Sequence, residues 1–91
     1  MISSARGEVL RLDQFLVYAR FCKTRAVAEA LVEKHGVRIN CQPTTKAHAR
    51  LHVGDVVTVA LPNGVKVLQV VRLPARREAA TLAQGCYREL A

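Results

Sequence analysis

The pattern of apolar and polar positions predicts a first helix that begins near Arg11. Four apolar residues recur at intervals of three or four positions, as they do on one face of a helix: Leu12, Phe15, Leu16 and Ala19. Asp13 falls in the first turn, where the free amides and the helix dipole favour a carboxylate. It can cap those amides or fix Arg11 through charge-assisted hydrogen bonds. We therefore expect Asp13 to have a structural role.

A second helix is predicted to start at Thr24 and to stop at Gly36. The threonine hydroxyl can accept a hydrogen bond from one of the unpaired amides of the first turn. Glycine at the end adopts a positive φ without steric cost. The residues expected to be buried again share helical spacing: Val27, Ala28, Leu31 and Val32.

The middle of the chain has the features of a small antiparallel sheet. Residues 37–40 alternate, with Val37 and Ile39 expected to point inward and Arg38 outward. Residues 41–50 are polar without a clear period and are expected to form a loop. Beyond them, residues 56–61 and 65–73 are strand-like and flank a Pro-Asn-Gly turn, which is typical of a β-hairpin.

The last segment, residues 74–91, is predicted to be a helix that begins after Pro74. Its apolar residues approximate one face: Ala79, Leu82, Ala83, Cys86 and Leu90. We therefore expect a flexible lead-in over residues 1–9, one domain over residues 10–73, and a C-terminal helix that packs on this domain or extends it. The fold class is α/β (α+β), with two N-terminal helices packed on a small, mainly antiparallel sheet.

The charge balance points to a polyanionic partner. The chain of 91 residues has 14 Lys and Arg against 7 acidic residues, a net charge of +7. Nine of the basic residues and four of the acidic ones lie in residues 1–50. Nucleic acid is the first candidate partner and an anionic membrane the second. The helices need their apolar faces for the core, and no apolar run approaches the roughly 20 residues of a membrane span, so we expect no membrane partner.

The basic residues are concentrated around the bend between the two helices. Lys23 and Arg25 bracket the start of the second helix at Thr24, where free amides and cations together suit a phosphate. Arg20 flanks the same bend, and Arg11 opens the first helix and could reach the same side. The alternative is that each is an ordinary solvated surface residue. Further candidate donors lie on the following strand and loop: Arg38, Asn40, Gln42, Lys46, His48 and Arg50.

The remaining chemistry favours binding over catalysis. Cys22, Cys41 and Cys86 are odd in number and widely spaced, which is typical of a reducing compartment and not of a disulfide framework. His48 and His52 have metal-ligand spacing, but no second cysteine near Cys41 completes a zinc set. The acidic residues are scattered, so we expect no enzyme activity, metal, cofactor or small-molecule substrate.

Residues 11–26 and 37–40 resemble a known family. The string R-L-D-x-F-L-x-x-A-R-F-x-K-T-R-A, followed by Val37-Arg38-Ile39-Asn40, is similar to the S4 RNA-binding domain and to its ribosome-associated heat-shock branch. The resemblance covers residues 11–59 and implies the alpha-L motif of that family. The family usually has glycine where Cys41 stands here.

The resemblance implies a function and a set of site residues. It implies binding to structured ribosomal RNA of the large subunit, with peptidyl-tRNA as a further candidate ligand, on cytoplasmic subunits blocked by an unfinished chain. The charge pattern and the resemblance together predict these RNA-binding residues: Arg11, Arg20, Lys23, Thr24, Arg25, Arg38, Asn40, Gln42, Lys46, His48 and Arg50. Two alternatives stay open: a general binder of structured RNA or DNA, and a regulatory module that binds an acidic protein.

Overall fold

The computed structural model describes residues 9–90 of the chain. The predicted lead-in, residues 1–9, lies almost wholly outside this range. The elements follow in chain order: β1 Leu10–Arg11, α1 Leu12–Tyr18, α2 Arg25–His35, β2 Val37–Ile39, β3 Gln42–Thr44, β4 Arg50–Leu51, β5 Val56–Leu61, β6 Gly64–Val70, α3 Ala80–Ala83, a 3-10 turn Gln84–Cys86, and β7 Tyr87–Glu89.

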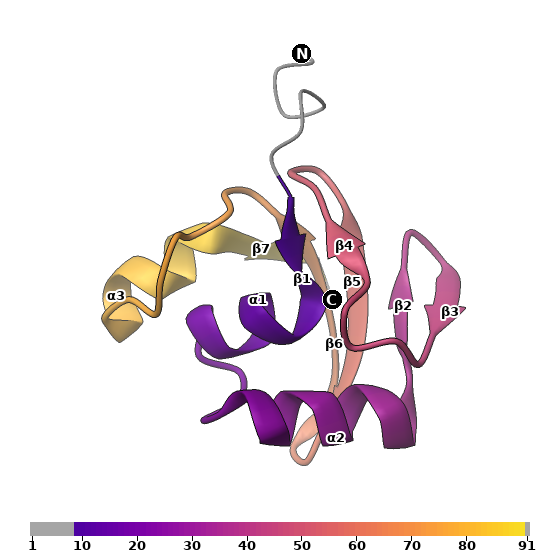
Figure 1. Cartoon of the computed structure of the whole chain (residues 1–91). Helices are drawn as coiled ribbons and strands as arrows, with labels where there is room; N and C mark the ends of the chain where they lie inside the picture. Colours follow the sequence, from indigo (N-terminus) through magenta and orange to yellow (C-terminus); the bar gives the residue numbers. More distant parts are fainter. Residues whose placement is uncertain (1–8, 91) are drawn as a thin grey trace.

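Five strands form an antiparallel sheet in the order β3-β2-β5-β6-β7, and β1 pairs separately with β4. Helices α1 and α2 lie together on one face of the sheet, and α3 lies beyond the end of α1 (Figure 1). This confirms the predicted class of two helices on a mainly antiparallel sheet. The β5–β6 hairpin is the longest ladder and forms the centre of the sheet.

The two helices follow the predicted apolar patterns with one exception. All four predicted residues of α1 are buried, and Thr24 accepts a hydrogen bond from the Val27 amide at 3.2 Å, as expected of a cap. Ala28 and Val32 of α2 are buried, and Leu31 is half-buried against the core. Val27, however, is 52% exposed. Its prediction as a core residue was wrong, because it lies in the first turn beside the cap and away from the sheet.

The bend between α1 and α2 has a specific backbone conformation. Arg20 has a φ of +71°, in the left-handed region that costs a non-glycine residue about 1–2 kcal/mol. The amides of Phe21 and Cys22 both donate to the carbonyl of Leu16 and so close the end of α1. These bonds fix the direction in which the chain enters α2.

The predicted loop over residues 41–50 contains a short strand. β3 pairs with β2 through a tight turn at Asn40 and Cys41, whose φ values are +52° and +69°. The positive φ of Cys41 explains why glycine suits this position. The sequence pattern did not predict β3, because Gln42, Pro43 and Thr44 do not alternate between apolar and polar residues. This strand forms because it pairs with β2.

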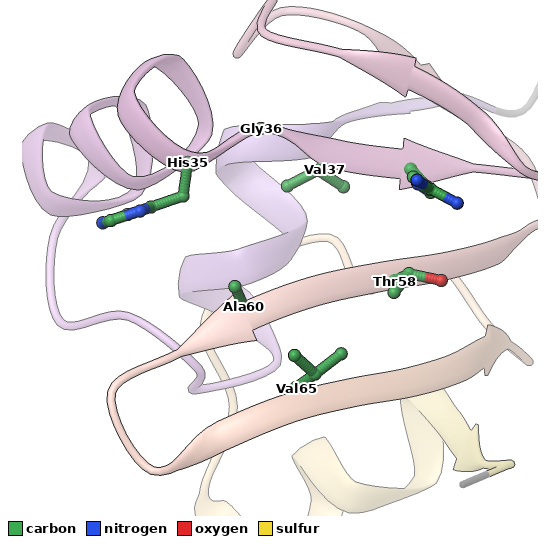
Figure 2. Close-up of a pocket in the computed structure, with 7 residues that line it drawn as sticks. His35, Gly36, Val37, Thr58, Ala60 and Val65 are labelled. Atoms are coloured by element: carbon green, nitrogen blue, oxygen red, sulfur yellow. The ribbon is translucent and has the colours of Figure 1, made fainter.

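Residues alternate across the sheet between a covered and an uncovered face. Val37, Val57 and Val59 are buried under the helices, whereas Arg38 and Thr58 lie on the opposite face. Figure 2 shows Thr58, Ala60 and Val65 on the adjoining strands β5 and β6. Among the described residues, no helix packs on this face.

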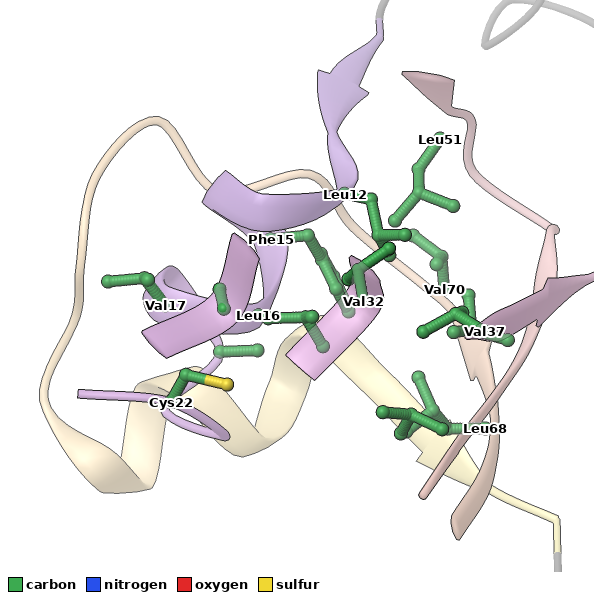
Figure 3. Close-up of a cluster of buried hydrophobic side chains, with 14 of the residues drawn as sticks. Leu12, Phe15, Leu16, Val17, Cys22, Val32, Val37, Leu51, Leu68 and Val70 are labelled. Carbon is green, nitrogen blue, oxygen red and sulfur yellow. The ribbon is translucent and has the colours of Figure 1, made fainter. Parts of the chain in front are cut away.

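The core lies between the helices and the covered face of the sheet. Figure 3 shows Phe15 and Leu16 of α1 beside Val32 of α2, with Leu68 and Val70 of β6 on the sheet side. All five side chains are almost completely buried. At about 1.5–3 kcal/mol for each large apolar side chain, their burial stabilises the bend that carries the basic residues.

The prediction of a helix over residues 74–91 was wrong in extent. Only one turn, Ala80–Ala83, is α-helical, and Tyr87–Glu89 forms the edge strand β7 paired with β6. Ala83 and Cys86 are buried as expected, but Leu82 and Leu90 are 61% and 49% exposed. Tyr87–Glu89 makes strand hydrogen bonds with the edge of β6 in place of hydrogen bonds within a helix, and Gly85 weakens helix formation.

Candidate nucleic-acid interface

Asp13 is the centre of the most basic part of the molecule. Its carboxylate accepts from Arg11 Nη2 at 3.0 Å and from Arg25 Nη2 at 3.4 Å, and it also accepts from the Gln14 amide at 2.8 Å. Asp13 is completely buried, whereas the side chains of Arg11 and Arg25 are 36% and 48% exposed. The carboxylate therefore lies behind two guanidinium groups that face outward.

The environment of Asp13 keeps its carboxyl ionised. Burial by itself would raise the pKa of Asp13. The hydrogen bonds from Arg11 and from the Gln14 amide, together with the positive charges of Arg11 and Arg25, outweigh burial and lower that pKa below its ordinary value. A carboxylate that is charged at neutral pH can hold both guanidinium groups in place.

The loop before β4 is bound to the start of α1. The Leu12 amide donates to the Ala49 carbonyl at 2.8 Å, and the Asp13 amide donates to the Ala47 carbonyl at 3.0 Å. These bonds satisfy amides that a helix leaves unpaired at its N-terminus. In the β1–β4 ladder, Arg50 lies directly opposite Arg11. Two cations thus face one another across neighbouring strands.

Lys46 and His48 project from the same loop toward α2. They line a shallow hollow with Glu33, Thr45 and Ala47, and both of their side chains are exposed. The loop therefore adds Lys46, His48 and Arg50 to the two arginines held by Asp13. We call this set of five the basic cluster: Arg11, Arg25, Lys46, His48 and Arg50.

His48 lies between two carboxylates. Its Nε2 is 3.6 Å from Glu29 Oε2 and 4.0 Å from Asp13 Oδ2. One ligand atom from each of these three residues falls within 4.8 Å of the others, so they could approach a metal ion together. Two guanidinium groups already bind the Asp13 oxygens and would repel a cation. The guanidinium groups therefore suit an anion bound at the surface of the cluster better than a metal ion bound between Asp13, Glu29 and His48.

The start of α2 lies beside the basic cluster. Thr24 caps the helix, Arg25 is its first residue, and Lys23 precedes the cap. Lys23 is exposed, and no carboxylate of residues 9–90 lies within 4.0 Å of its ammonium group. An anion at this point would meet an uncompensated cation next to the positive end of a helix.

Four predicted site residues lie away from this region or have other partners. Arg38 is on the uncovered face of the sheet. Gln42 is exposed in β3. Arg20 donates from Nη1 to the Glu78 carbonyl at 3.1 Å. The Asn40 side chain donates to Asp55 Oδ1 and accepts from the Val56 amide, so both ends of its amide fix the β2–β3 turn.

Comparison with known proteins identifies the domain. The S4 domain model matches residues 10–57, more than half of the chain. The chain belongs to the S4 domain family. The matched part contains the whole basic cluster, Lys23 and the α1–α2 bend. The C-terminal segment with α3 and β7 lies beyond the matched part of the S4 domain.

Individual relatives extend the similarity beyond the S4 domain. The chain is 35% identical over 80 residues to the Heat shock protein 15 homolog of Haemophilus influenzae and 32% identical over 80 residues to that of Aeromonas salmonicida. Each match covers 88% of this chain and 60% of the relative, so the chain spans less than two thirds of their length.

A solved structure shows the same fold. The trimeric Heat Shock Protein 15 of Vibrio cholerae has a TM-score of 0.84 and 34% sequence identity. The match covers 92% of this chain and 84% of that one. It therefore includes most of the segment that lies beyond the S4 domain.

Two acidic features of the site were not predicted from the sequence. Glu29 faces His48, and Glu33 lines the hollow beside Lys46. Helical spacing does place Glu29 and Glu33 one turn apart on the same face of α2. That spacing gives no sign of which loop lies opposite, because the loop is brought there by its bonds to α1.

Proposed function

We propose that this protein binds structured RNA through the basic cluster and Lys23, and that its role is binding and not catalysis. The observation that carries the proposal is the buried Asp13 carboxylate, which holds Arg11 and Arg25 side by side at the capped start of α2. Guanidinium groups fixed in this way can donate to phosphate oxygens without first losing side-chain freedom.

The arrangement of like charges supports a polyanionic ligand. Arg11 and Arg50 are direct cross-strand neighbours, and such pairs of equal sign destabilise a ladder. Asp13 offsets only part of this charge, because Arg25 uses the same carboxylate. A phosphate bound between the arginines would offset the remainder and would release counterions from the nucleic acid.

The scarcity of exposed aromatic residues favours folded RNA over single strands. Phe15 is buried, and the other three aromatic side chains are half-buried against the core: Tyr18, Phe21 and Tyr87. Single-stranded nucleic acids are bound largely by stacking of bases on exposed aromatic rings. Double-helical RNA is recognised through its shape and its backbone, which suits a surface of cations.

The RNA we propose is ribosomal RNA of the large subunit, with peptidyl-tRNA as a second ligand, on cytoplasmic subunits blocked by an unfinished chain. The support is the membership in the S4 domain family, the similarity to relatives named Heat shock protein 15 homolog, and the basic cluster itself. The described helices include none with the length and apolar character to cross a membrane.

Sedimentation with ribosomal particles tests this function. The protein should migrate with large subunits in a sucrose gradient and should leave that fraction after full ribonuclease digestion. Co-migration that survives digestion would instead indicate an acidic protein partner. In a second measurement, large-subunit ribosomal RNA should compete far better than a DNA duplex of equal charge. Equal competition would indicate a general polyanion binder.

A further inference from the structure

The C-terminal segment, residues 74–90, contacts the bend between α1 and α2. The Arg20 guanidinium donates to the Glu78 carbonyl at 3.1 Å, and the rings of Phe21 and Tyr87 are 4.8 Å apart. Segments 58 residues apart in the chain therefore lie side by side, as the position of α3 beyond the end of α1 in Figure 1 also shows. The segment is part of the same surface as the bend.

The Glu78 carboxylate, next in the chain to Arg77, is already paired. Arg72 binds Glu78 through two hydrogen bonds of 2.9 Å each and also donates to the Leu82 carbonyl at 2.9 Å. These bonds from Arg72 are the main reason that the pKa of Glu78 is lowered. The positive charge of Arg76 contributes to the same lowering, whereas the hydrogen bonds of the Glu78 carboxylate to an arginine are with Arg72.

Arg76 and Arg77 are exposed cations with no ion-pair partner among residues 9–90. Arg77 is the covalent neighbour of Glu78, so its Cα lies about 3.8 Å from the Cα of the residue that accepts from Arg20. Lys23 follows Arg20 by three residues in the bend. Four cations thus lie on the two chain segments that this contact joins: Arg20, Lys23, Arg76 and Arg77.

We propose that Arg76 and Arg77 form a second phosphate-binding surface, which continues the interface of the basic cluster across the bend to the C-terminal segment. This inference rests on the proposed function. The ligand is an RNA backbone, because its row of phosphates can meet cations on both sides of the bend at once and because the adjoining basic cluster is proposed to bind RNA. The surface lies outside residues 10–57, so the S4 domain match does not include it.

The test compares two double variants of equal charge. Arg76→Gln with Arg77→Gln removes the proposed surface. Lys34→Gln with Arg88→Gln removes two exposed cations elsewhere, in the last turn of α2 and in β7. The measurement is the affinity for purified bacterial large-subunit ribosomal RNA as a function of salt concentration. Circular dichroism and thermal unfolding show that each variant is folded.

We expect Arg76→Gln with Arg77→Gln to weaken binding about tenfold near 0.15 M salt and to lower the slope of log K against log salt by about 1.5. The control pair should change neither value appreciably. Arg76→Lys with Arg77→Lys retains the charge and should retain most of the affinity. If this charge-retaining pair lost as much affinity as the glutamine pair, the proposed phosphate contacts would be contradicted.

A third variant separates this inference from the proposed function. Lys23→Gln with Arg25→Gln alters the start of α2 and should weaken binding of the same RNA. If it weakens binding while Arg76→Gln with Arg77→Gln binds normally, the proposed second surface is contradicted and the proposed interface at the basic cluster is retained. If neither pair weakens binding, both proposals fail. Loss of binding to polyglutamate, with RNA binding unchanged, would assign Arg76 and Arg77 to an acidic protein instead.

Discussion

Arg25 Nη2 lies 3.4 Å from Asp13 Oδ2, so the first residue of α2 is bound to the first turn of α1. Arg11 binds the same carboxylate at 3.0 Å from the strand that precedes α1. The carboxylate of one buried residue thus joins β1, α1 and α2. It also determines where two guanidinium groups are presented, which connects the stability of the fold to its proposed function.

Asp13→Asn should lower the free energy of unfolding by about 1–3 kcal/mol at pH 7, because it removes charge-assisted hydrogen bonds from a buried position. The pKa of Asp13 is lower in the folded chain than its ordinary value. Its stabilising effect is therefore complete above the unfolded pKa of about 4 and is lost as pH falls through the folded pKa. Urea unfolding at pH 7, 5 and 3 measures this.

The difference between wild type and Asp13→Asn should be similar at pH 7 and 5 and smaller at pH 3. Glu33→Gln provides the control, since Glu33 is an exposed residue of α2. Its effect should stay within about 0.5 kcal/mol at pH 7. A difference for Asp13→Asn that grew as the pH fell would contradict the assigned ion pairs.

The contact between Phe21 and Tyr87 should couple the bend to the C-terminal segment. Their ring centroids are 4.8 Å apart with an interplanar angle of 48°. We expect a coupling free energy of about 0.5–1.5 kcal/mol from the variants Phe21→Leu and Tyr87→Leu and from the double variant. Additive effects of the two substitutions would show that the segment does not dock on the bend.

Local features of the chain were sufficient to predict α1, α2 and the central hairpin. The stripe from Leu12 to Ala19, the cap at Thr24 and the stop at Gly36 each act within a few residues, and the structure shows all three. Val27 shows the limit of such patterns. Helical spacing identifies a face, but the sheet determines how far along the helix that face is covered.

The C-terminal segment was mispredicted because its conformation depends on distant residues. β7 takes its hydrogen bonds from β6, and Glu78 is held by Arg72 and Arg20. Distant residues also decide which of the predicted binding residues lie on one surface. Arg38 was correctly expected to point outward, but only the sheet pairing shows that this direction leads away from the basic cluster.

Thiol labelling offers an independent check on the packing. Cys41 is exposed at the β2–β3 turn, whereas Cys22 and Cys86 are buried. Burial raises the pKa of both buried thiols and reduces their reactive thiolate form. In the native protein at pH 7.5, iodoacetamide should modify Cys41 first, and all three should react in denaturant. Rapid native labelling of Cys86, read by peptide mass spectrometry, would contradict the docked C-terminal segment.

The most direct test of the proposed interface is an NMR titration of the ¹⁵N-labelled protein with a structured ribosomal RNA fragment. The account predicts the largest shifts and broadening at the amides of residues 11–14, 23–27 and 45–51, which surround the buried carboxylate of Asp13. Residues of the uncovered sheet face, such as Thr58 and Val67, should change little. Perturbations confined to that sheet face would contradict the account.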